Sequence, residues 1–143
     1  MSISERISPF IGRMALAWFF LSEAWARAND WGGTVAMLRD AKIPAAEPVL
    51  VLALAILMLG GTALAIGYHA RHGAMLLFGF TIATALALHA YWKAPDGPAR
   101  SAEYSVFIRD LAVAGGLLLL VGLGPGPFAV DNFGRKRRAL SHA

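Results

Sequence analysis

Long apolar runs separated by short polar segments dominate the sequence. The runs 49–68 and 73–92 are twenty residues each and contain no Asp, Glu, Lys or Arg. A third run, 106–123, has eighteen residues and carries Arg109 and Asp110 near its start. A helix needs about 20 mostly apolar residues to cross the hydrocarbon core of a bilayer. The pattern therefore predicts membrane-spanning helices in these three ranges.

A fourth span is expected over residues 10–28, where Arg13, Glu23 and Arg27 interrupt the apolar pattern. The same segment also resembles a secretory signal, because basic residues precede a short apolar run and the triplet 24–26 has the A-x-A form of a cleavage site. Glu23 is a poor neighbour for such a site. A retained first helix is favoured, which gives an all-α, four-helix transmembrane bundle.

Composition supports a location in the bilayer. Of the 143 residues, 57% are hydrophobic and 15% are charged, against about 25% charged residues in a typical protein. Nothing divides the sequence, so residues 1–143 are expected to form a single membrane domain. The chain has no cysteine, which excludes disulfides, thiolate catalysis and cysteine-ligated metal clusters. The net charge of +4 comes from basic residues at segment ends, which suits lipid headgroups and argues against a nucleic-acid partner.

The segments between the apolar runs predict the connections and the orientation. Residues 29–48 are expected to form a polar loop, 70–72 a tight turn and 93–103 a second exposed loop. With four spans, the tight turn and both ends of the chain share one side of the membrane. Lys and Arg divide almost evenly between the sides, but the basic tail 132–143 concentrates them in 135–138. Under the positive-inside rule, this cluster predicts cytoplasmic termini in an inner (plasma) membrane.

Small residues recur at helical spacing and predict close helix contacts, because they allow backbones to approach where lipid competes with side chains. The stripes are Gly60, Ala63 and Gly67 in one run, Gly79, Ala83 and Ala87 in the next, and Ala112 and Gly116 in the last.

Several short motifs are spread along most of the chain: Gly12-Arg13, Phe20-Leu21-Ser22, Pro44, Gly60-Gly61, Arg71, His89-Ala90-Tyr91-Trp92, Arg109-Asp110-Leu111, Gly115-Gly116, Gly124-Pro125-Gly126 and Val130-Asp131. Together they resemble the DoxX-like membrane proteins, and the last part of the chain is the most specific. The sequence departs from the family at Glu23, where relatives often have glycine, and at Leu57, where many have glutamate. Arg109-Asp110 stands where the family has a basic residue followed by asparagine.

The resemblance implies a four-helix membrane bundle and an association with membrane redox complexes. Some DoxX-like proteins are subunits of thiosulfate–quinone oxidoreductases, and most have no assigned reaction. Any family role tied to the glutamate that Leu57 replaces is not implied for this chain.

Ionisable residues within the expected spans are the candidate site. A charge at the bilayer centre costs roughly 2.5–3.5 kcal/mol, so it needs a partner or a function. Glu23 and Arg27 are four residues apart and therefore share a helix face. With four spans, this pair, His89, Arg109 and Asp110 fall toward the same end of the bundle. We expect these five side chains to lie at similar depth.

Two interpretations of this group remain open. In the first, the side chains form a structural clamp between helices. In the second, they line a pocket for a quinone or a small acidic ligand, in which His89 donates to a carbonyl or moves protons and Trp92 or Tyr91 stacks on the ring. No metal site is expected, because His69 and His72 have no evident third ligand.

The sequence and the resemblance together predict an accessory or anchoring subunit of a membrane redox system, with quinone as the candidate cofactor and other redox subunits as candidate partners. One alternative is a stand-alone quinone-dependent oxidoreductase. Another is a structural or lipid-binding bundle without catalysis. The chain lacks cysteine, a second histidine at the depth of His89 for haem and a nucleotide-binding motif, which favours the accessory role.

Overall fold

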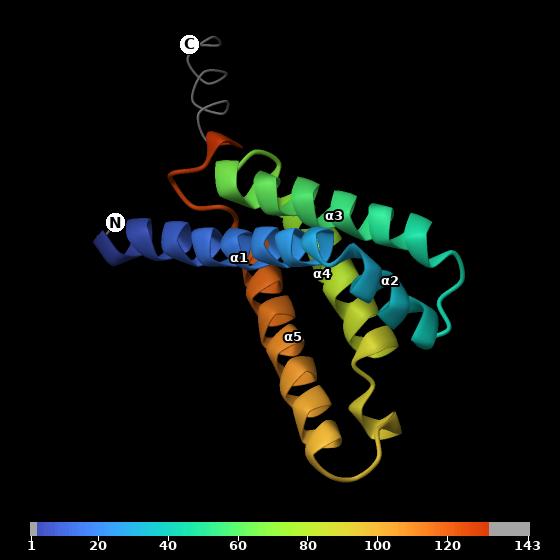
Figure 1. Cartoon of the computed structure of the whole chain (residues 1–143). Helices are drawn as coiled ribbons and strands as arrows, with labels where there is room; N and C mark the ends of the chain where they lie inside the picture. The colour runs from blue at the N-terminus through green and yellow to red at the C-terminus, as the bar shows by residue number, and fades with distance from the viewer. Residues whose placement is uncertain (1–2, 132–143) are drawn as a thin grey trace, which may run out of the picture.

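The structure is a computed structural model that describes residues 3–131 (Figure 1). Its helices are α1 (Ile3–Asn29), α2 (Trp31–Asp40), α3 (Ala46–Ile66), α4 (Ala70–Leu88), the short 3-10 helix η1 (Tyr91–Lys93) and α5 (Pro98–Leu123). The described part contains no β-strand, so the all-α prediction is confirmed. The basic tail 132–143, on which the expected orientation depends, lies outside the described residues.

Within residues 3–131, three helical segments are long and apolar enough to cross a membrane. They are Ala46–Ile66, Ala70–Lys93 and Pro98–Leu123, with mean hydropathies of 2.7, 1.7 and 2.1. Helix α1 has 27 residues, and at about 1.5 Å per residue its length of roughly 40 Å exceeds a hydrocarbon core of about 30 Å. Because of its charged residues, α1 nevertheless does not have the composition expected of a membrane-spanning helix. Length and composition thus support three of the four expected spans, namely those over residues 49–68, 73–92 and 106–123.

The expected loop 29–48 contains a helix, α2. The carboxylate of Asp30 accepts a hydrogen bond from the Gly33 N–H, with 3.2 Å between Oδ1 and N, and so caps the start of the helix. Val35 and Leu38 are buried against the beginning of α3. The low helix propensity of glycines 32 and 33 favoured the prediction of a loop. That prediction was wrong, because the Asp30 cap and the buried face of Val35 and Leu38 stabilise a helix.

The other two connections also differ from the expectation. The tight turn lies at 67–69 rather than 70–72, because α4 begins at Ala70. Gly67 and His69 make the turn with φ values of 75° and 48°. Helix α5 begins at Pro98 and absorbs the second half of the expected loop 93–103. Proline is favourable there because the first helical residue needs no intrahelical N–H bond.

The bundle consists of two helix pairs. Helices α1 and α3 lie next to each other, and α4 and α5 form a hairpin that extends away from them in Figure 1. All four long helices contribute apolar side chains to one core, which includes Ala17, Phe20, Ala24, Leu57, Leu64, Leu77 and Leu117.

Helices α3 and α4 approach closely along one predicted small-residue stripe. A Cβ on Gly73 would lie 2.9 Å from the Cβ of Ala63 and 3.4 Å from the carbonyl oxygen of Gly60. In contrast, a Cβ on Gly79 would have no heavy atom within 4 Å, and Ala83 is exposed. The contact expected at Gly60 and Ala63 is confirmed. The close contact expected along 79, 83 and 87 was wrong, because all three residues are exposed and no helix of the described chain packs closely on them.

We expect Gly73→Val to destabilise the bundle by about 1–3 kcal/mol, because the added side chain overpacks the α3–α4 contact. Gly79→Val is the matched control, since its side chain enters open space. Thermal unfolding of both variants in detergent or lipid measures the difference. Equal stabilities would contradict the close contact.

Candidate functional site

A group of polar side chains lies inside the bundle where α1, α4 and α5 meet. We call it the Asp110 cluster and define it as Glu23, Arg27, Thr81, Thr84, His89, Arg109 and Asp110, which line one small cavity together with Phe19, Phe20, Leu57 and Phe80. The cavity has a volume of about 20 Å³, roughly enough for one water molecule. The structure thus brings Glu23, Arg27, His89, Arg109 and Asp110 together, as the sequence predicts.

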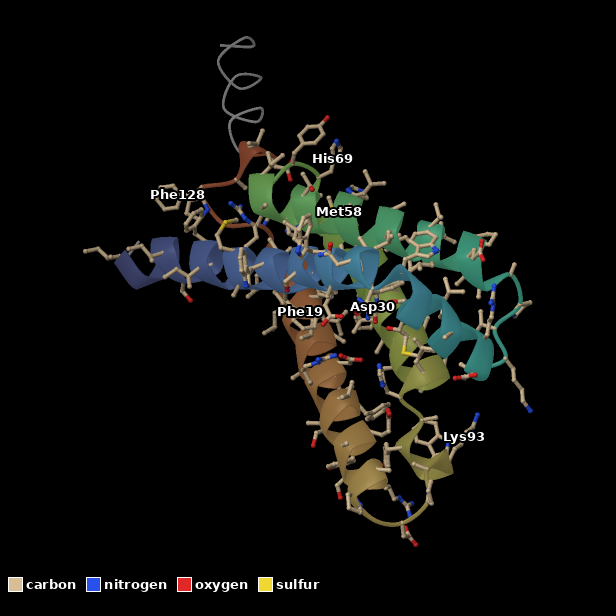
Figure 2. The ribbon with its side chains drawn as sticks, in the orientation of Figure 1. Phe19, Asp30, Met58, His69, Lys93 and Phe128 are labelled. Carbon is tan, nitrogen blue, oxygen red and sulfur yellow. The ribbon has the colours of Figure 1, made fainter. Side chains whose placement is uncertain are left out.

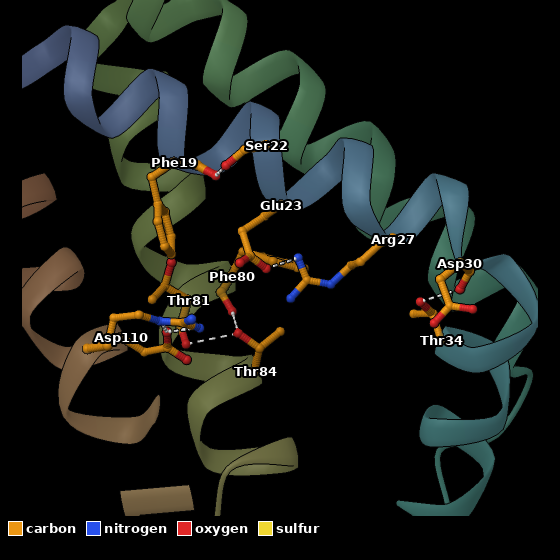
Figure 3. A network of polar contacts seen from close by, with 11 residues as sticks. Phe19, Ser22, Glu23, Arg27, Asp30, Thr34, Phe80, Thr81, Thr84 and Asp110 are labelled. Carbon is orange, nitrogen blue, oxygen red and sulfur yellow. Dashed lines mark hydrogen bonds and ion pairs between the residues drawn. The ribbon is translucent and has the colours of Figure 1, made fainter. Parts of the chain in front are cut away.

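Glu23 and Arg27 form an ion pair on α1. Arg27 Nη1 lies 2.7 Å from Glu23 Oε2, and the side chains are 22% and 27% exposed. Figure 3 shows both side chains directed toward the part of α4 that carries Phe80, Thr81 and Thr84. The pair therefore places two opposite charges at the α1–α4 contact, where they largely neutralise each other.

Asp110 is the buried acid of the cluster, at 6% exposure. Its Oδ1 accepts hydrogen bonds from Arg109 Nε at 3.2 Å and Nη2 at 3.1 Å. The Arg109 guanidinium also lies over the Phe19 ring of α1, 5.4 Å from its centroid. Neighbouring residues on a helix point in different directions, so the long Arg109 side chain must fold back to neutralise Asp110. This arrangement joins α5 to α1.

Two threonines of α4 complete the cluster. Thr84 Oγ1 donates to a backbone carbonyl of the preceding turn, either that of Phe80 at 3.0 Å or that of Thr81 at 3.1 Å (Figure 3). Thr81 is 4% exposed, and its hydroxyl has no hydrogen-bond partner among the described residues. Neither threonine is predicted as a site residue from the sequence. They are the polar side chains nearest the middle of the run 73–92, which was the available signal.

His89 is hydrogen-bonded to Glu103, a residue that the sequence does not predict to be part of the site. Its Nδ1 lies 2.9 Å from Oε2 of Glu103 on α5, so it ties the end of α4 to the next helix. Trp92 lies apart from the cavity and is 47% exposed. Its ring instead contacts Tyr91 and Phe107, with centroid distances of 5.3 and 5.8 Å. Exposed aromatic residues are typical of a membrane–water interface.

An apolar groove between α2, α3 and α4 reaches the Asp110 cluster. It has a volume of about 240 Å³. Its apolar walls include Leu50, Ala53, Ile56, Ala83 and Ala87, and it shares Arg27, Phe80 and Thr84 with the cluster cavity. The groove therefore offers an apolar surface that ends on a guanidinium and a hydroxyl.

A second polar site lies at the other end of the bundle. Arg13 of α1 is 1% exposed, and its guanidinium donates to the carbonyl of Pro125 at 2.9 Å from Nη1 and to that of Phe128 at 3.2 Å from Nη2. It also lies 5.5 Å from the centroid of the Phe10 ring. Figure 2 shows Phe128 and His69 at this end and Lys93 at the opposite end.

Asp131 joins the same end of the bundle to the α3–α4 turn. Its carboxylate accepts from the backbone N–H of His69 at 2.8 Å and of Ala70 at 3.2 Å. Its own N–H donates to the Gly67 carbonyl at 3.1 Å. A carboxylate at a helix N-terminus satisfies otherwise unpaired N–H groups and complements the helix dipole. We call Arg13, Asp131, the turn 67–70 and the segment 124–128 the Arg13–Asp131 latch.

Only glycine fits at position 67 of the latch. A Cβ on Gly67 would lie 2.7 Å from Arg13 Nη1 and 2.8 Å from the Ala129 Cα. Its φ of +75° is also unfavourable for other residues. In the sequence Arg13 and Asp131 are family markers, and no contact is predicted for either residue.

Comparisons with known proteins identify the family of this chain. The DoxX family model matches residues 8–90. The chain belongs to the DoxX family. It is 26% identical to inner membrane protein YqjF of Escherichia coli over 133 residues, which are 93% of this chain and 96% of that protein. It is 30% identical to inner membrane protein YphA of the same organism over 123 residues, which are 85% and 86% of the two chains.

A shorter match links this DoxX-family protein to the Surfeit locus protein 4 homolog of Schizosaccharomyces pombe, with 34% identity over 67 residues, 46% of this chain and 22% of that protein. No solved structure matches at the significance of these relatives. The expected family is thus confirmed, and the chain is a small membrane protein. The names of YqjF and YphA support the inner membrane as its location.

We expect Arg13→Met to destabilise the DoxX-family bundle by about 1–3 kcal/mol, because the Pro125 and Phe128 carbonyls lose their buried donor. Limited proteolysis should also cut the segment 124–131 sooner. Arg39→Met is the control, since the Arg39 side chain is 65% exposed in its ion pair with Glu47 and exposed pairs contribute about 0–1 kcal/mol. Similar unfolding and cleavage for the two variants would argue against the latch.

Proposed function

We propose that this protein is an accessory subunit of an inner-membrane redox system, that it crosses the membrane four times, and that it binds a quinone in the groove beside the Asp110 cluster. The accessory role is supported by the family resemblance and by a sequence without cysteine, which leaves no thiolate to carry electrons. The stand-alone oxidoreductase is the less favoured form of the same proposal.

The fourth crossing is proposed for α1. Charges within residues 10–28 would ordinarily oppose insertion, but Arg13, Glu23 and Arg27 have partners within the bundle. Glu23 and Arg27 pair with each other, and Arg13 is buried against two backbone carbonyls. The apolar side of α1 packs into the common core through Ala17, Phe20 and Ala24. Paired charges and a buried face both support a helix that lies within the bilayer.

Four crossings would place the start of α1, the α3–α4 turn and the end of α5 on one side. The Arg13–Asp131 latch joins these three parts of the chain. We propose that this side is cytoplasmic, because the basic residues 135–138 follow it in the sequence.

Single cysteines can test this topology, because the natural chain has none. We expect a membrane-impermeant maleimide to label Lys93→Cys in intact cells or spheroplasts. Ile3→Cys and His72→Cys should be labelled only after the membrane is permeabilised. Labelling of Ile3→Cys together with Lys93→Cys would mean that α1 does not cross. Complete reversal of the pattern would overturn the cytoplasmic orientation.

The groove between α2, α3 and α4 is the proposed quinone site. The main support for this proposal is that Arg27, Phe80 and Thr84 line both the groove and the cavity of the Asp110 cluster. A quinone has an apolar tail and carbonyl oxygens on its ring, so it suits an apolar groove that ends on a donor. Arg27 would donate to a ring carbonyl, and Glu23 would hold the guanidinium in place.

The cluster cavity itself is too small for the quinone ring. Its volume of about 20 Å³ compares with about 240 Å³ in the groove, while pockets for drug-sized ligands are roughly 300–1,000 Å³. The headgroup therefore belongs in the groove, with the tail extending into the lipid. In this proposal His89, Arg109 and Asp110 hold α4 and α5 around the site, and Trp92 has no contact with the ligand.

A second candidate function is a structural bundle without a ligand. It is favoured by the internal pairing of the cluster, since Glu23 pairs with Arg27 and Asp110 with Arg109. Such pairs hold helices together whether or not anything binds beside them.

Purification of the full chain from its native membrane in a mild detergent tests the proposal. We expect a stoichiometric protein partner and a retained quinone. Arg27→Gln should lower the retained quinone about tenfold or more, because a hydrogen bond from a charged donor is worth about 1.5–3 kcal/mol. Ala83→Phe should also reduce retention by filling the groove, while leaving the Glu23–Arg27 pair intact. Both variants should keep the partner.

Arg39→Gln is the control for the loss of one positive charge at an exposed position. Quinone that is no more abundant than in the bulk lipid extract would exclude the quinone site. The absence of any stoichiometric partner would exclude the accessory role. If both are absent from folded protein, the structural bundle is the remaining function.

A further inference from the structure

A large cleft separates the first half of α1 from the second half of α5. Its volume is about 600 Å³. One end is apolar and is lined by Leu16 of α1 and by Leu119 and Leu123 of α5. The other end is polar and is lined by Ser8 together with Arg13 and Gly124 of the Arg13–Asp131 latch.

The apolar part of the cleft fits an acyl chain. From Gly116 to Leu123 the wall of α5 extends about 10 Å at 1.5 Å per residue, the length of a substantial part of a lipid tail. Leu119 and Leu123 are 65% and 84% exposed, so nothing in the described chain covers this wall. The opposite wall is helix α1 at Ala15 and Leu16.

The polar end of the cleft fits a phosphate group. Arg13 is almost completely buried, yet its Nε–H has no hydrogen-bond partner among residues 3–131. The Arg71 guanidinium lies beside Gly124, since a Cβ on that glycine would be 3.1 Å from Arg71 Nη2. Asp131 is already engaged by the first N–H groups of α4. The polar end is therefore lined by Arg13 and Ser8, and the Arg71 guanidinium lies next to the lining residue Gly124, with the nearby acid Asp131 occupied.

We propose that this cleft is a binding site for one anionic phospholipid, with its phosphate beside Arg13 and Arg71 and an acyl chain between α1 and α5. Basic side chains at a membrane surface attract anionic headgroups, and a polar end above an apolar slot matches the amphipathic shape of a phospholipid. The inference rests on α1 lying in the bilayer, as proposed above, and it is independent of the quinone site.

Photocrosslinking tests the site. The purified full chain is reconstituted in phosphatidylcholine vesicles that contain either phosphatidylglycerol or phosphatidylcholine with a photoactivatable group in the acyl chain. We expect phosphatidylglycerol to label peptides within 8–16 and 116–127 about fivefold more strongly than phosphatidylcholine does. Arg71→Gln should reduce this preference, and Arg39→Gln should not.

Filling the cleft gives the matched comparison. Gly116→Leu points toward Leu16, since a Cβ there would lie 3.6 Å from the Leu16 Cδ2, whereas Gly115→Leu enters open space on the same helix. We expect Gly116→Leu to lower the phosphatidylglycerol labelling at least fivefold and Gly115→Leu to leave it unchanged. Ala15→Phe fills the cleft from α1 and replaces Gly116→Leu if that variant does not fold.

Three results would overturn the inference. Equal labelling by the two lipids would exclude recognition of the anionic headgroup. Labelling that survives both cleft-filling variants would place the lipid elsewhere. Labelling of α5 without α1 would show that α1 is outside the bilayer, which would also remove the four-span proposal but leave the quinone test unaffected.

Discussion

The burial of the Arg13 guanidinium is the constraint on which one end of this bundle depends. A guanidinium in a membrane protein needs acceptors for its N–H groups, and α1 cannot supply them because its own carbonyls are used within the helix. The acceptors are the carbonyls of Pro125 and Phe128, which follow α5 and are not part of a helix. The Gly-Pro-rich segment after α5 therefore interrupts regular structure at the point where free carbonyls are required. The irregular backbone at this position supplies hydrogen-bond acceptors for the Arg13 guanidinium, which the carbonyls within helices cannot do.

The two polar sites accommodate buried charge in different ways. The Arg13–Asp131 latch joins side chains to backbone groups, so it fixes the path of the chain around α1, the α3–α4 turn and the end of α5. The Asp110 cluster joins side chains of opposite charge, namely Glu23 with Arg27 and Asp110 with Arg109. Backbone contacts allow few alternatives, whereas side-chain pairs can exchange partners.

Sequence periodicity predicted the helices better than it predicted their contacts. The uncharged runs located α3 and α4 because a bilayer requires a long apolar stretch of any spanning helix. The positions of Glu23, Arg27 and Asp110 along the expected spans also predicted that they lie at the same level, and in the structure all three line one cavity.

Helix α2 was missed because its stability comes from the Asp30 cap and from packing, which outweigh the low helix propensity of two glycines. Thr81, Glu103 and the contacts of Arg13 were missed for a related reason. Their roles depend on which helix faces which, and in the case of Arg13 the partners are backbone carbonyls more than a hundred residues away, which have no signature in the side-chain pattern.

The position of Asp131 has a consequence for the order in which the protein is made. The N–H groups of His69 and Ala70 receive their acceptor from a residue 61 or 62 positions later in the chain. During synthesis α4 must therefore enter the membrane before its N-terminus has this partner, and the missing acceptor arrives only when α5 and the segment after it have followed. A nascent chain that stops before Asp131 has all of its long helices but an unfinished end on α4. Completion of the bundle is thus linked to insertion of the last helix, because the N-terminus of α4 gains its acceptor only from the segment that follows α5.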